Sequence, residues 1–218
     1  MSQPAAPYVH ALRFRWLTPF YDGLVAATTR ERKFRAAVIE QAGLRPGQRV
    51  LDLGCGTGTL AIEMARHCPG LQIFGLDGDA TVLAKAERKA TQAGVEITWQ
   101  QGLATRLPYP DASFDRAVST LFFHHLAAKD KVAAATELYR VLRPGGQLHV
   151  ADWGPPTSRL QRLLFLPVQL LDGFANTSPQ LAGGLVDVFR QAGFEGVQVT
   201  RRIPTLLGTM ALHSANRA

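Results

Sequence analysis

An apolar run that leads directly into three alternating glycines constrains the fold of this chain more than any other feature. Residues 49–54 read as a buried β-strand that ends at the first of three alternating glycines, Gly54, Gly56 and Gly58, before a segment with helical spacing begins. Glycine is favoured where another group must come close to the backbone. The order of strand, glycine loop and helix is typical of an open α/β sheet, in which ligands bind at the carboxyl ends of strands and at helix N-termini.

The rest of the chain continues this alternation of strand and helix patterns. Further strands are predicted at 71–77, 95–100, 114–123, 147–153 and as a pair within 194–215, and helices at 59–68, 80–94, 129–146 and 185–193. Such spacing indicates βαβ units and a mostly parallel sheet with helices on both faces. Too few residues separate the final pair for a crossover helix, so the last strand is expected to be antiparallel.

We expect one domain over residues 1–218, with two segments outside the alternation. The first is an N-terminal helical segment, 1–45, predicted as a lid. The second, 154–184, is predicted as a helical lid on the substrate side. Its apolar stretch 158–174 predicts a buried helix that Pro167 kinks or divides, while a dimer contact or an interfacial membrane helix are the alternatives.

Composition excludes several classes of protein. No run of about 18 apolar residues is present, and the first residues lack the pattern of a secretory signal. Two isolated cysteines, Cys55 and Cys68, argue against a disulfide scaffold and against a metal site, which suits a cytoplasmic location. The net charge of +7 suggests that the protein binds nucleic acid. The cations are not interleaved with aromatic residues, however, so we do not expect such binding. Contact with an anionic substrate or a membrane surface stays open.

The glycine loop differs from a dinucleotide fingerprint, which places glycine at its first, third and sixth positions. Here Thr59 occupies the sixth position, and Asp52 ends the strand where it would face a pyrophosphate. A cationic cofactor without phosphates would tolerate that carboxylate. Asp77 ends the second predicted strand and could accept hydrogen bonds from ribose hydroxyls in either cofactor class. A tight turn without a ligand is the remaining interpretation.

Several segments together carry a family resemblance. VLDLGCGTG (50–58) with GLD (75–77), LPYPDASFDRAVST (107–120), FFHHL (122–126) and ELYRVLRPGGQLHVADW (137–153) resemble the class I S-adenosylmethionine-dependent methyltransferases. The group that they resemble most is the small-molecule methyltransferases related to ubiquinone and menaquinone C-methyltransferases. The resemblance implies a doubly wound, Rossmann-like seven-stranded sheet with S-adenosyl-L-methionine as cofactor and S-adenosyl-L-homocysteine as product.

The resemblance also implies a set of cofactor-binding residues. Asp52 would orient the amino group of the cofactor, the glycines would let the backbone approach its methionine part, and Asp77 would hold the ribose hydroxyls. The full set is Asp52, Gly54, Cys55, Gly56, Gly58, Asp77, Gly78, Leu103, Ala104 and Ser119. One position departs from the family pattern: Leu103 stands where an acid usually contacts the adenine, so only packing or backbone groups could read the base there. The loss of one such polar contact costs about 1 kcal/mol.

Four residues are candidates for chemistry on the acceptor side. His124 and His125 follow the fourth strand, where cofactor and acceptor should meet, and one of them could act as a base or orient the acceptor. Tyr21 lies in a segment that resembles part of a lid over the cofactor. The alternative is that the histidines bond only to backbone and that Tyr21 only packs. Asp152, at the end of the fifth strand, is a base, an acceptor ligand or a helix cap.

The acceptor class can be narrowed by what is missing. No Asn/Asp-Pro-Pro-aromatic segment follows the fourth strand, which argues against methylation of exocyclic amines on bases, and no cysteine lies where a pyrimidine-directed nucleophile would be needed. The prediction is in-line methyl transfer to an O, N or C atom of a small molecule, with an apolar one favoured. The alternatives are an RNA or protein methyltransferase of the same fold, a non-catalytic cofactor-binding protein or an NAD-type oxidoreductase. A monomer and a homodimer are equally compatible with the sequence.

Overall fold

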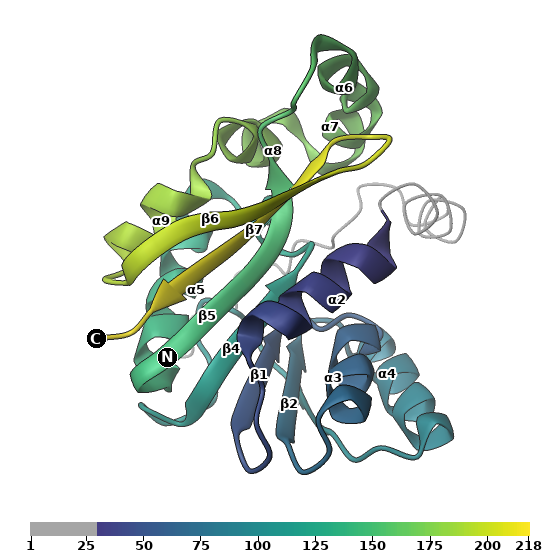
Figure 1. The fold of residues 1–218 in the computed structure, drawn as a ribbon, viewed down its shortest axis with the longest axis vertical. Helices are drawn as coiled ribbons and strands as arrows, with labels where there is room; N and C mark the ends of the chain where they lie inside the picture. The colour runs from purple at the N-terminus through teal and green to yellow at the C-terminus, as the bar shows by residue number, and fades with distance from the viewer. Residues whose placement is uncertain (1–29) are drawn as a thin grey trace, which may run out of the picture.

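One seven-stranded sheet forms the centre of the computed structural model, which describes residues 30–218 except for the side chains of residues 171 and 172. Its strand order is β3-β2-β1-β4-β5-β7-β6 (Figure 1). The strands are β1 Arg49–Leu53, β2 Gln72–Asp77, β3 Thr98–Gln101, β4 Phe114–Thr120, β5 Leu142–Gly154, β6 Glu195–Pro204 and β7 Thr209–Asn216. Strand β7 is antiparallel to both of its neighbours, and all other pairs are parallel. The predicted fold class, including the antiparallel last strand, is confirmed.

Helices cover both faces of this sheet, as Figure 1 shows. They are α2 Glu31–Ala42, α3 Thr59–His67, α4 Ala80–Ala93, α5 Ala128–Val141, α6 Arg159–Leu164, α7 Leu166–Asp172, α8 Phe174–Leu181 and α9 Leu185–Gln191, with a short 3-10 helix η2 at Phe123–His125. Buried residues divide into two clusters because successive strand residues point to opposite faces. Val50 packs with α2 and α3, whereas Leu51 packs with α5 and α9.

Helix α2 is part of the core rather than a detached element. It contacts β4, β5, β7 and α3, and it buries Phe34 and Val38 completely. Arg35 donates to Glu31 within α2 and to Glu63 on α3, at 2.5 and 3.0 Å, so this member of the basic N-terminal region ties two helices together. Residues 1–29 lie outside the described part of the chain, and the lid predicted for this segment stays a prediction.

The start of β5 differs from the sequence prediction. The helix predicted within 129–146 was expected to stop at Pro144-Gly145-Gly146, but α5 ends at Val141 and β5 begins at the next residue. The backbone of Gly145 donates to Arg217, and Arg217 donates back to Gly146. Pairing with the chain terminus thus holds the Pro-Gly-Gly stretch in an extended, bulged strand, which local sequence does not reveal.

The inserted segment forms three short helices instead of one buried lid helix. Pro167 lies in the first turn of α7, where proline is favoured because no intrahelical bond to its nitrogen is lost, and it divides the stretch as predicted. The expectation of burial is wrong for most of its apolar residues. Exposed side chains gather at this end of the molecule, on α6 to α8 and at the tip of the β6–β7 hairpin. They are Leu160, Leu163, Leu166, Leu170, Phe174 and Leu206, and we call them the apolar end face.

Within residues 30–218, every helix falls short of the length and apolar character that crossing a membrane requires.

Buried histidine makes the fold sensitive to acid. His149 on β5 is 2% exposed, and burial followed by the charge of Arg116 lowers its pKa to about 4. The unfolded chain therefore binds one more proton than the folded chain between about pH 6.5 and pH 4, so stability falls as the pH drops through that window. The free energy of unfolding should fall between about pH 7.5 and pH 5, and we expect this fall to be about 2 kcal/mol smaller in His149→Leu than in the parent protein. Urea titrations at the two pH values measure it, and an unchanged difference would contradict the assignment.

Candidate active site

The glycine loop after β1 contains one open position. Gly54, Gly56 and Gly58 all have positive φ, of 67°, 53° and 72°. A Cβ atom at Gly54 would lie 2.2 Å from the ring of Phe122, and one at Gly58 would lie 2.4 Å from Trp99, so packing alone requires glycine at both. A Cβ at Gly56 would meet nothing within 4 Å. Among the three, Gly56 is the position at which a ligand can approach bare backbone.

Asp77 fixes the conformation of this loop. Its Oδ2 accepts a hydrogen bond from the backbone of Gly56 and its Oδ1 accepts one from the backbone of Asp79, both at 3.0 Å. Carboxylate oxygens have further lone pairs, so the same group can still accept hydroxyl donors. Asp77 therefore shapes the open position.

Asp52 is a second, buried carboxyl group beside Asp77. It is 1% exposed, and within the described residues its Oδ2 has no hydrogen-bond partner. Burial, followed by repulsion from Asp77, raises its pKa to about 7. A cationic group beside Asp52 would satisfy the unpaired oxygen and reverse that shift. An ammonium group such as the amino group of S-adenosylmethionine fits this position.

The other predicted cofactor residues lie around the loop, and most of them are at least partly buried. The backbone of Cys55 donates to Leu76, and burial raises the pKa of its thiol, so the thiol is inert. Ser119 is buried and its hydroxyl donates to Leu53, which ties β4 to β1. Gly78 accepts from Gln101 through its carbonyl. Ala104 is buried, whereas the Leu103 side chain is 47% exposed.

A buried histidine–aspartate pair lies at the carboxyl ends of β4 and β5. His124 Nδ1 is 2.8 Å from Asp152 Oδ1, and the His124 backbone donates to Oδ2 at 3.3 Å. The backbone of Trp153 also donates to Oδ1, at 2.7 Å. Neither side chain of the pair is more than 5% exposed. Parallel neighbouring strands end at the same edge of the sheet, so residues 28 positions apart in sequence meet here.

The charges around this pair determine which of its groups is ionised. Burial raises the pKa of Asp152, but the charge of His124 and its hydrogen bond outweigh burial, so the net pKa is lowered and the carboxylate is ionised. The His125 ring lies 3.9 Å from the His124 ring, and burial followed by the charge of His124 lowers the pKa of His125 well below its usual range. His125 is therefore neutral, and His124 is the histidine with a carboxylate partner.

Lys131 on α5 is a charged neighbour that sequence analysis missed. It is 2% exposed, its Nζ donates to the Asn176 carbonyl on α8 at 2.5 Å, and its charge interacts with Asp152. Asn176 in turn donates to the carbonyl of His125 at 3.3 Å. These contacts attach α8 to the histidine segment. A lysine on an amphipathic helix carries no sequence signal that would have set it apart.

The structure thus brings together some of the predicted residues and not others. His124 and His125 lie beside Asp152, which pairs with His124 instead of capping a helix. Tyr21 lies outside the described residues, so its role stays a prediction. Within residues 30–218, no cluster of three or more His, Cys, Asp or Glu side chains is arranged to hold a metal ion.

Comparison with known proteins places this site in a family. A family model described as a methyltransferase domain matches residues 50–146. A demethylmenaquinone methyltransferase of Lactiplantibacillus plantarum is 31% identical, with 89% of this chain and 92% of that protein aligned. A demethylmenaquinone methyltransferase of Deinococcus radiodurans is 37% identical over 70% of this chain and 63% of its own length, so this chain spans less than two thirds of that relative. A solved structure of an S-adenosylmethionine-dependent methyltransferase from Aquifex aeolicus superimposes with a TM-score of 0.64 at 19% identity, covering 84% of this chain and 89% of that one.

The chain belongs to the class I S-adenosylmethionine-dependent methyltransferases, in the group related to the ubiquinone and menaquinone C-methyltransferases. The predicted family, whose cofactor is S-adenosylmethionine, is confirmed. The oxidoreductase and the non-catalytic alternatives find no support among these relatives.

Proposed function

We propose that this protein transfers the methyl group of S-adenosylmethionine to a ring carbon of a small hydroxylated aromatic molecule of the quinol type. The names of the relatives from Lactiplantibacillus and Deinococcus point to such an acceptor. The observation that carries the proposal is the buried His124–Asp152 pair. His124 comes two residues after Phe122, whose ring lies against the glycine loop. A general base is needed only when the acceptor must lose a proton, and this pair could supply one.

The cofactor residues act by position and charge. Asp52 would hold the cationic amino group, Asp77 the ribose hydroxyls, and the open backbone at Gly56 would lie against the methionine part. When bound, the cofactor supplies a methyl group already activated by a positively charged sulfur. The protein therefore needs to align the acceptor with that methyl and to exclude water.

On the acceptor side, His124 acts as the general base. Removing the hydroxyl proton of a quinol-type ring raises the electron density of the adjacent ring carbon, which then forms the new carbon–methyl bond. The ring proton at that carbon then passes to water, which restores aromaticity, and the imidazolium of His124 returns its proton to the ring oxygen. Asp152 is a positioning residue, because it fixes the His124 ring through Nδ1 and stabilises the imidazolium that forms.

A product analysis tests this proposal. The full chain is incubated with S-adenosylmethionine carrying a labelled methyl group and with 1,4-dihydroxynaphthalene under reducing conditions. We expect S-adenosylhomocysteine and a product whose label is bonded to a ring carbon, seen by mass spectrometry and carbon NMR. A label found only on oxygen would overturn the ring-carbon assignment. Transfer to RNA or protein with none to the quinol would overturn the acceptor class.

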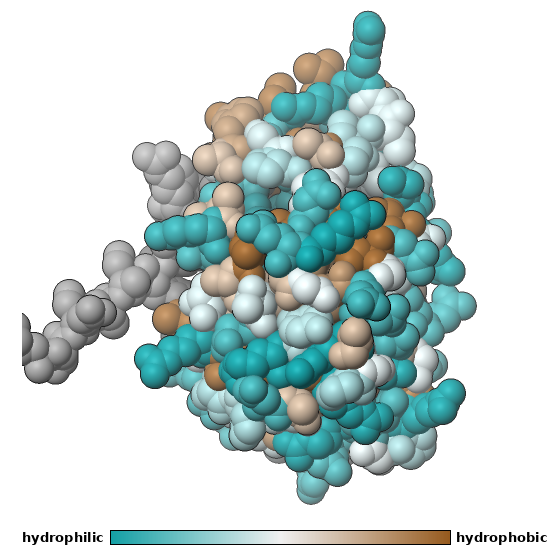
Figure 2. All heavy atoms as spheres, turned by 90° about the vertical axis from the view of Figure 1, so that its left-hand side faces the viewer, coloured by the Kyte–Doolittle hydropathy of each residue, from teal (hydrophilic) through white to brown (hydrophobic). Residues whose placement is uncertain are grey.

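We also propose that the apolar end face contacts an anionic lipid surface, from which an apolar acceptor would be taken, and that the protein acts in the cytoplasm. Leu160, Leu163 and Leu170 are each more than 60% exposed, and Figure 2 shows hydrophobic atoms at the end of the molecule that carries α6 in Figure 1. Arg159 and Arg162 lie among them, and residues 155–171 contain no acid. Exposed leucines with interspersed arginines are the pattern of an interfacial helix.

Vesicle flotation tests the lipid contact. We expect the protein to float with phosphatidylglycerol-containing vesicles, less so at high salt, and we expect the double variant Leu163→Glu/Leu170→Glu to bind at least about tenfold more weakly. Leu103→Glu, which adds one acid at a leucine outside the apolar end face, is the control and should float like the parent protein. Flotation that is absent, or equal in the double variant, would contradict this role of the face.

A further inference from the structure

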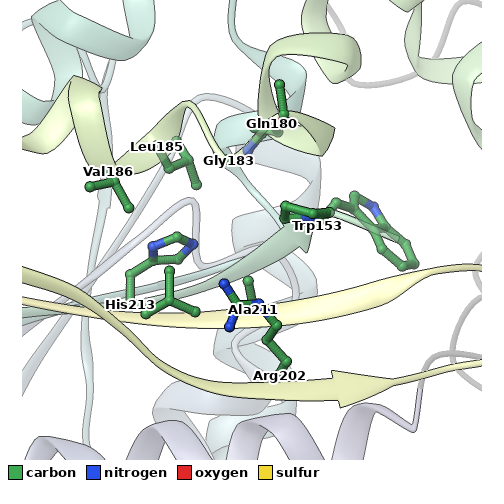
Figure 3. Close-up of a pocket in the computed structure, with 12 residues that line it drawn as sticks. Trp153, Gln180, Gly183, Leu185, Val186, Arg202, Ala211 and His213 are labelled. Atoms are coloured by element: carbon green, nitrogen blue, oxygen red, sulfur yellow. The ribbon is translucent and has the colours of Figure 1, made fainter. Parts of the chain in front are cut away.

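A cavity lies away from the glycine loop, between the β5–β7–β6 part of the sheet and helices α8 and α9 (Figure 3). Its volume is about 200 Å³. A cavity of about 150 Å³ accommodates a benzene molecule, so this space has room for one substituted aromatic ring. Its wall is largely apolar and is formed in the main by Trp153, Leu185, Val186, Val199 and Ala211.

Two buried polar residues in this wall bring no charge to the cavity. Gln180 on α8 and His213 on β7 both line it and are almost completely buried. Both polar atoms of the Gln180 carboxamide, and Nδ1 of His213, are enclosed by the surrounding protein, so they are out of reach of a molecule in the cavity. Burial lowers the pKa of His213 to about 4, and the charge of Arg202 lowers it further, so the ring is neutral near neutral pH.

Arg202 on β6 is the single charged residue among the described residues that line the cavity. It is exposed, and Figure 3 shows its guanidinium turned toward His213 and the cavity. The neighbouring Arg201 forms an ion pair with Glu40 on α2 at 3.3 Å, whereas none of the ion pairs within residues 30–218 involves Arg202. A cation beside an apolar wall attracts an anion more strongly than one surrounded by water, because the local dielectric is lower. The cavity thus combines an apolar space with one unpaired positive charge at its mouth.

We propose that this cavity is a binding site for a small aromatic monocarboxylate. The ring of such a molecule fills the apolar space between Trp153 and Val186, and its carboxylate remains at the mouth and pairs with Arg202. One guanidinium matches one carboxylate through two parallel N–H bonds, whereas a phosphate group would have more acceptor oxygens than this single side chain serves. This site does not depend on the proposed acceptor, since none of its lining residues belongs to the cofactor loop or the His124–Asp152 pair.

Two probes of the same shape test the site on the full chain. Benzoate carries the negative charge, whereas benzamide keeps the ring and the carbonyl but is neutral. We expect saturable benzoate binding with a Kd of about 1 mM, and binding of benzamide about tenfold weaker. The NMR signals of the Val186 methyl groups and the His213 ring should shift with the same Kd, and added salt should weaken benzoate binding. Equal binding of the two probes, or no saturable binding of benzoate, would overturn the proposal.

Variants locate the binding. Arg202→Gln removes the charge at an exposed position, so it should leave the fold intact and weaken benzoate binding about tenfold while leaving benzamide binding unchanged. Arg201→Gln is the matched control: it makes the same change in charge at the next residue of β6, whose side chain pairs with Glu40 on α2, and it should change neither affinity. Val186→Phe fills the cavity from α9 and should abolish binding of both probes. Benzoate affinity that survives Arg202→Gln, or that falls equally in Arg201→Gln, would place the probe elsewhere and refute the assignment, even if Val186→Phe does not fold.

Discussion

Replacing Gly56 with valine is expected to abolish cofactor binding, with a loss of S-adenosylhomocysteine affinity of at least about 100-fold, or about 2.7 kcal/mol. A valine side chain would project into the open space that the other two loop glycines lack. It would also force a β-branched residue into the left-handed region. The backbone N–H at position 56, which donates a hydrogen bond to Asp77, would then be displaced. Isothermal titration calorimetry with S-adenosylhomocysteine measures the loss.

Gly43 provides a closely matched control. It ends helix α2 with the same φ of 53°, and a Cβ there would likewise meet nothing within 4 Å. Gly43→Val should therefore carry a similar backbone strain, about 1–2 kcal/mol of stability, while leaving cofactor affinity unchanged. If Gly56→Val still bound the cofactor like the Gly43→Val protein, the glycine loop would not be the cofactor site.

The alternation of strands and helices along the chain and the position of this loop follow from the sequence because both depend on local patterns. Apolar runs buried on two faces, each ending at glycine or an acid, mark parallel strands and their carboxyl ends. The separate roles of the loop glycines do not follow in this way. Phe122 and Trp99, which require glycine at positions 54 and 58, come from strands and turns more than 40 residues further along the chain. Only the assembled sheet shows that Gly56 alone is open.

The same distinction holds on the acceptor side. His124 follows one predicted strand and Asp152 lies at the end of the next, so the parallel sheet topology already brings them to one edge. Their hydrogen bond, and the burial that makes it strong, required the structure. Lys131 and Gln180 belong to helices whose polar residues look like ordinary surface positions in the sequence. The packing of α8 against the sheet and against η2 is what buries them.

Asp152→Asn is expected to lower kcat for methyl transfer about 100-fold while leaving S-adenosylhomocysteine affinity unchanged. The amide keeps the shape of the carboxylate and can still bond to the backbone of His124 or Trp153. It cannot stabilise the imidazolium that forms when His124 takes the acceptor proton, and general-base catalysis of this kind contributes about 10²–10⁴ in rate. Steady-state kinetics with saturating cofactor measure the effect.

The pH profile separates catalysis from structure. Without the carboxylate, protonated His124 loses its counter-ion, so the acid limb of kcat should move to lower pH in Asp152→Asn. Asp115→Asn is the matched control: this aspartate is also buried, but it accepts from the Arg49 backbone and pairs with Arg143 at the opposite edge of the sheet. The control variant should lose stability without a shifted acid limb. An unshifted limb in Asp152→Asn, with kcat intact, would mean that the acceptor reacts without a base and that the buried pair serves only to hold η2 against β5.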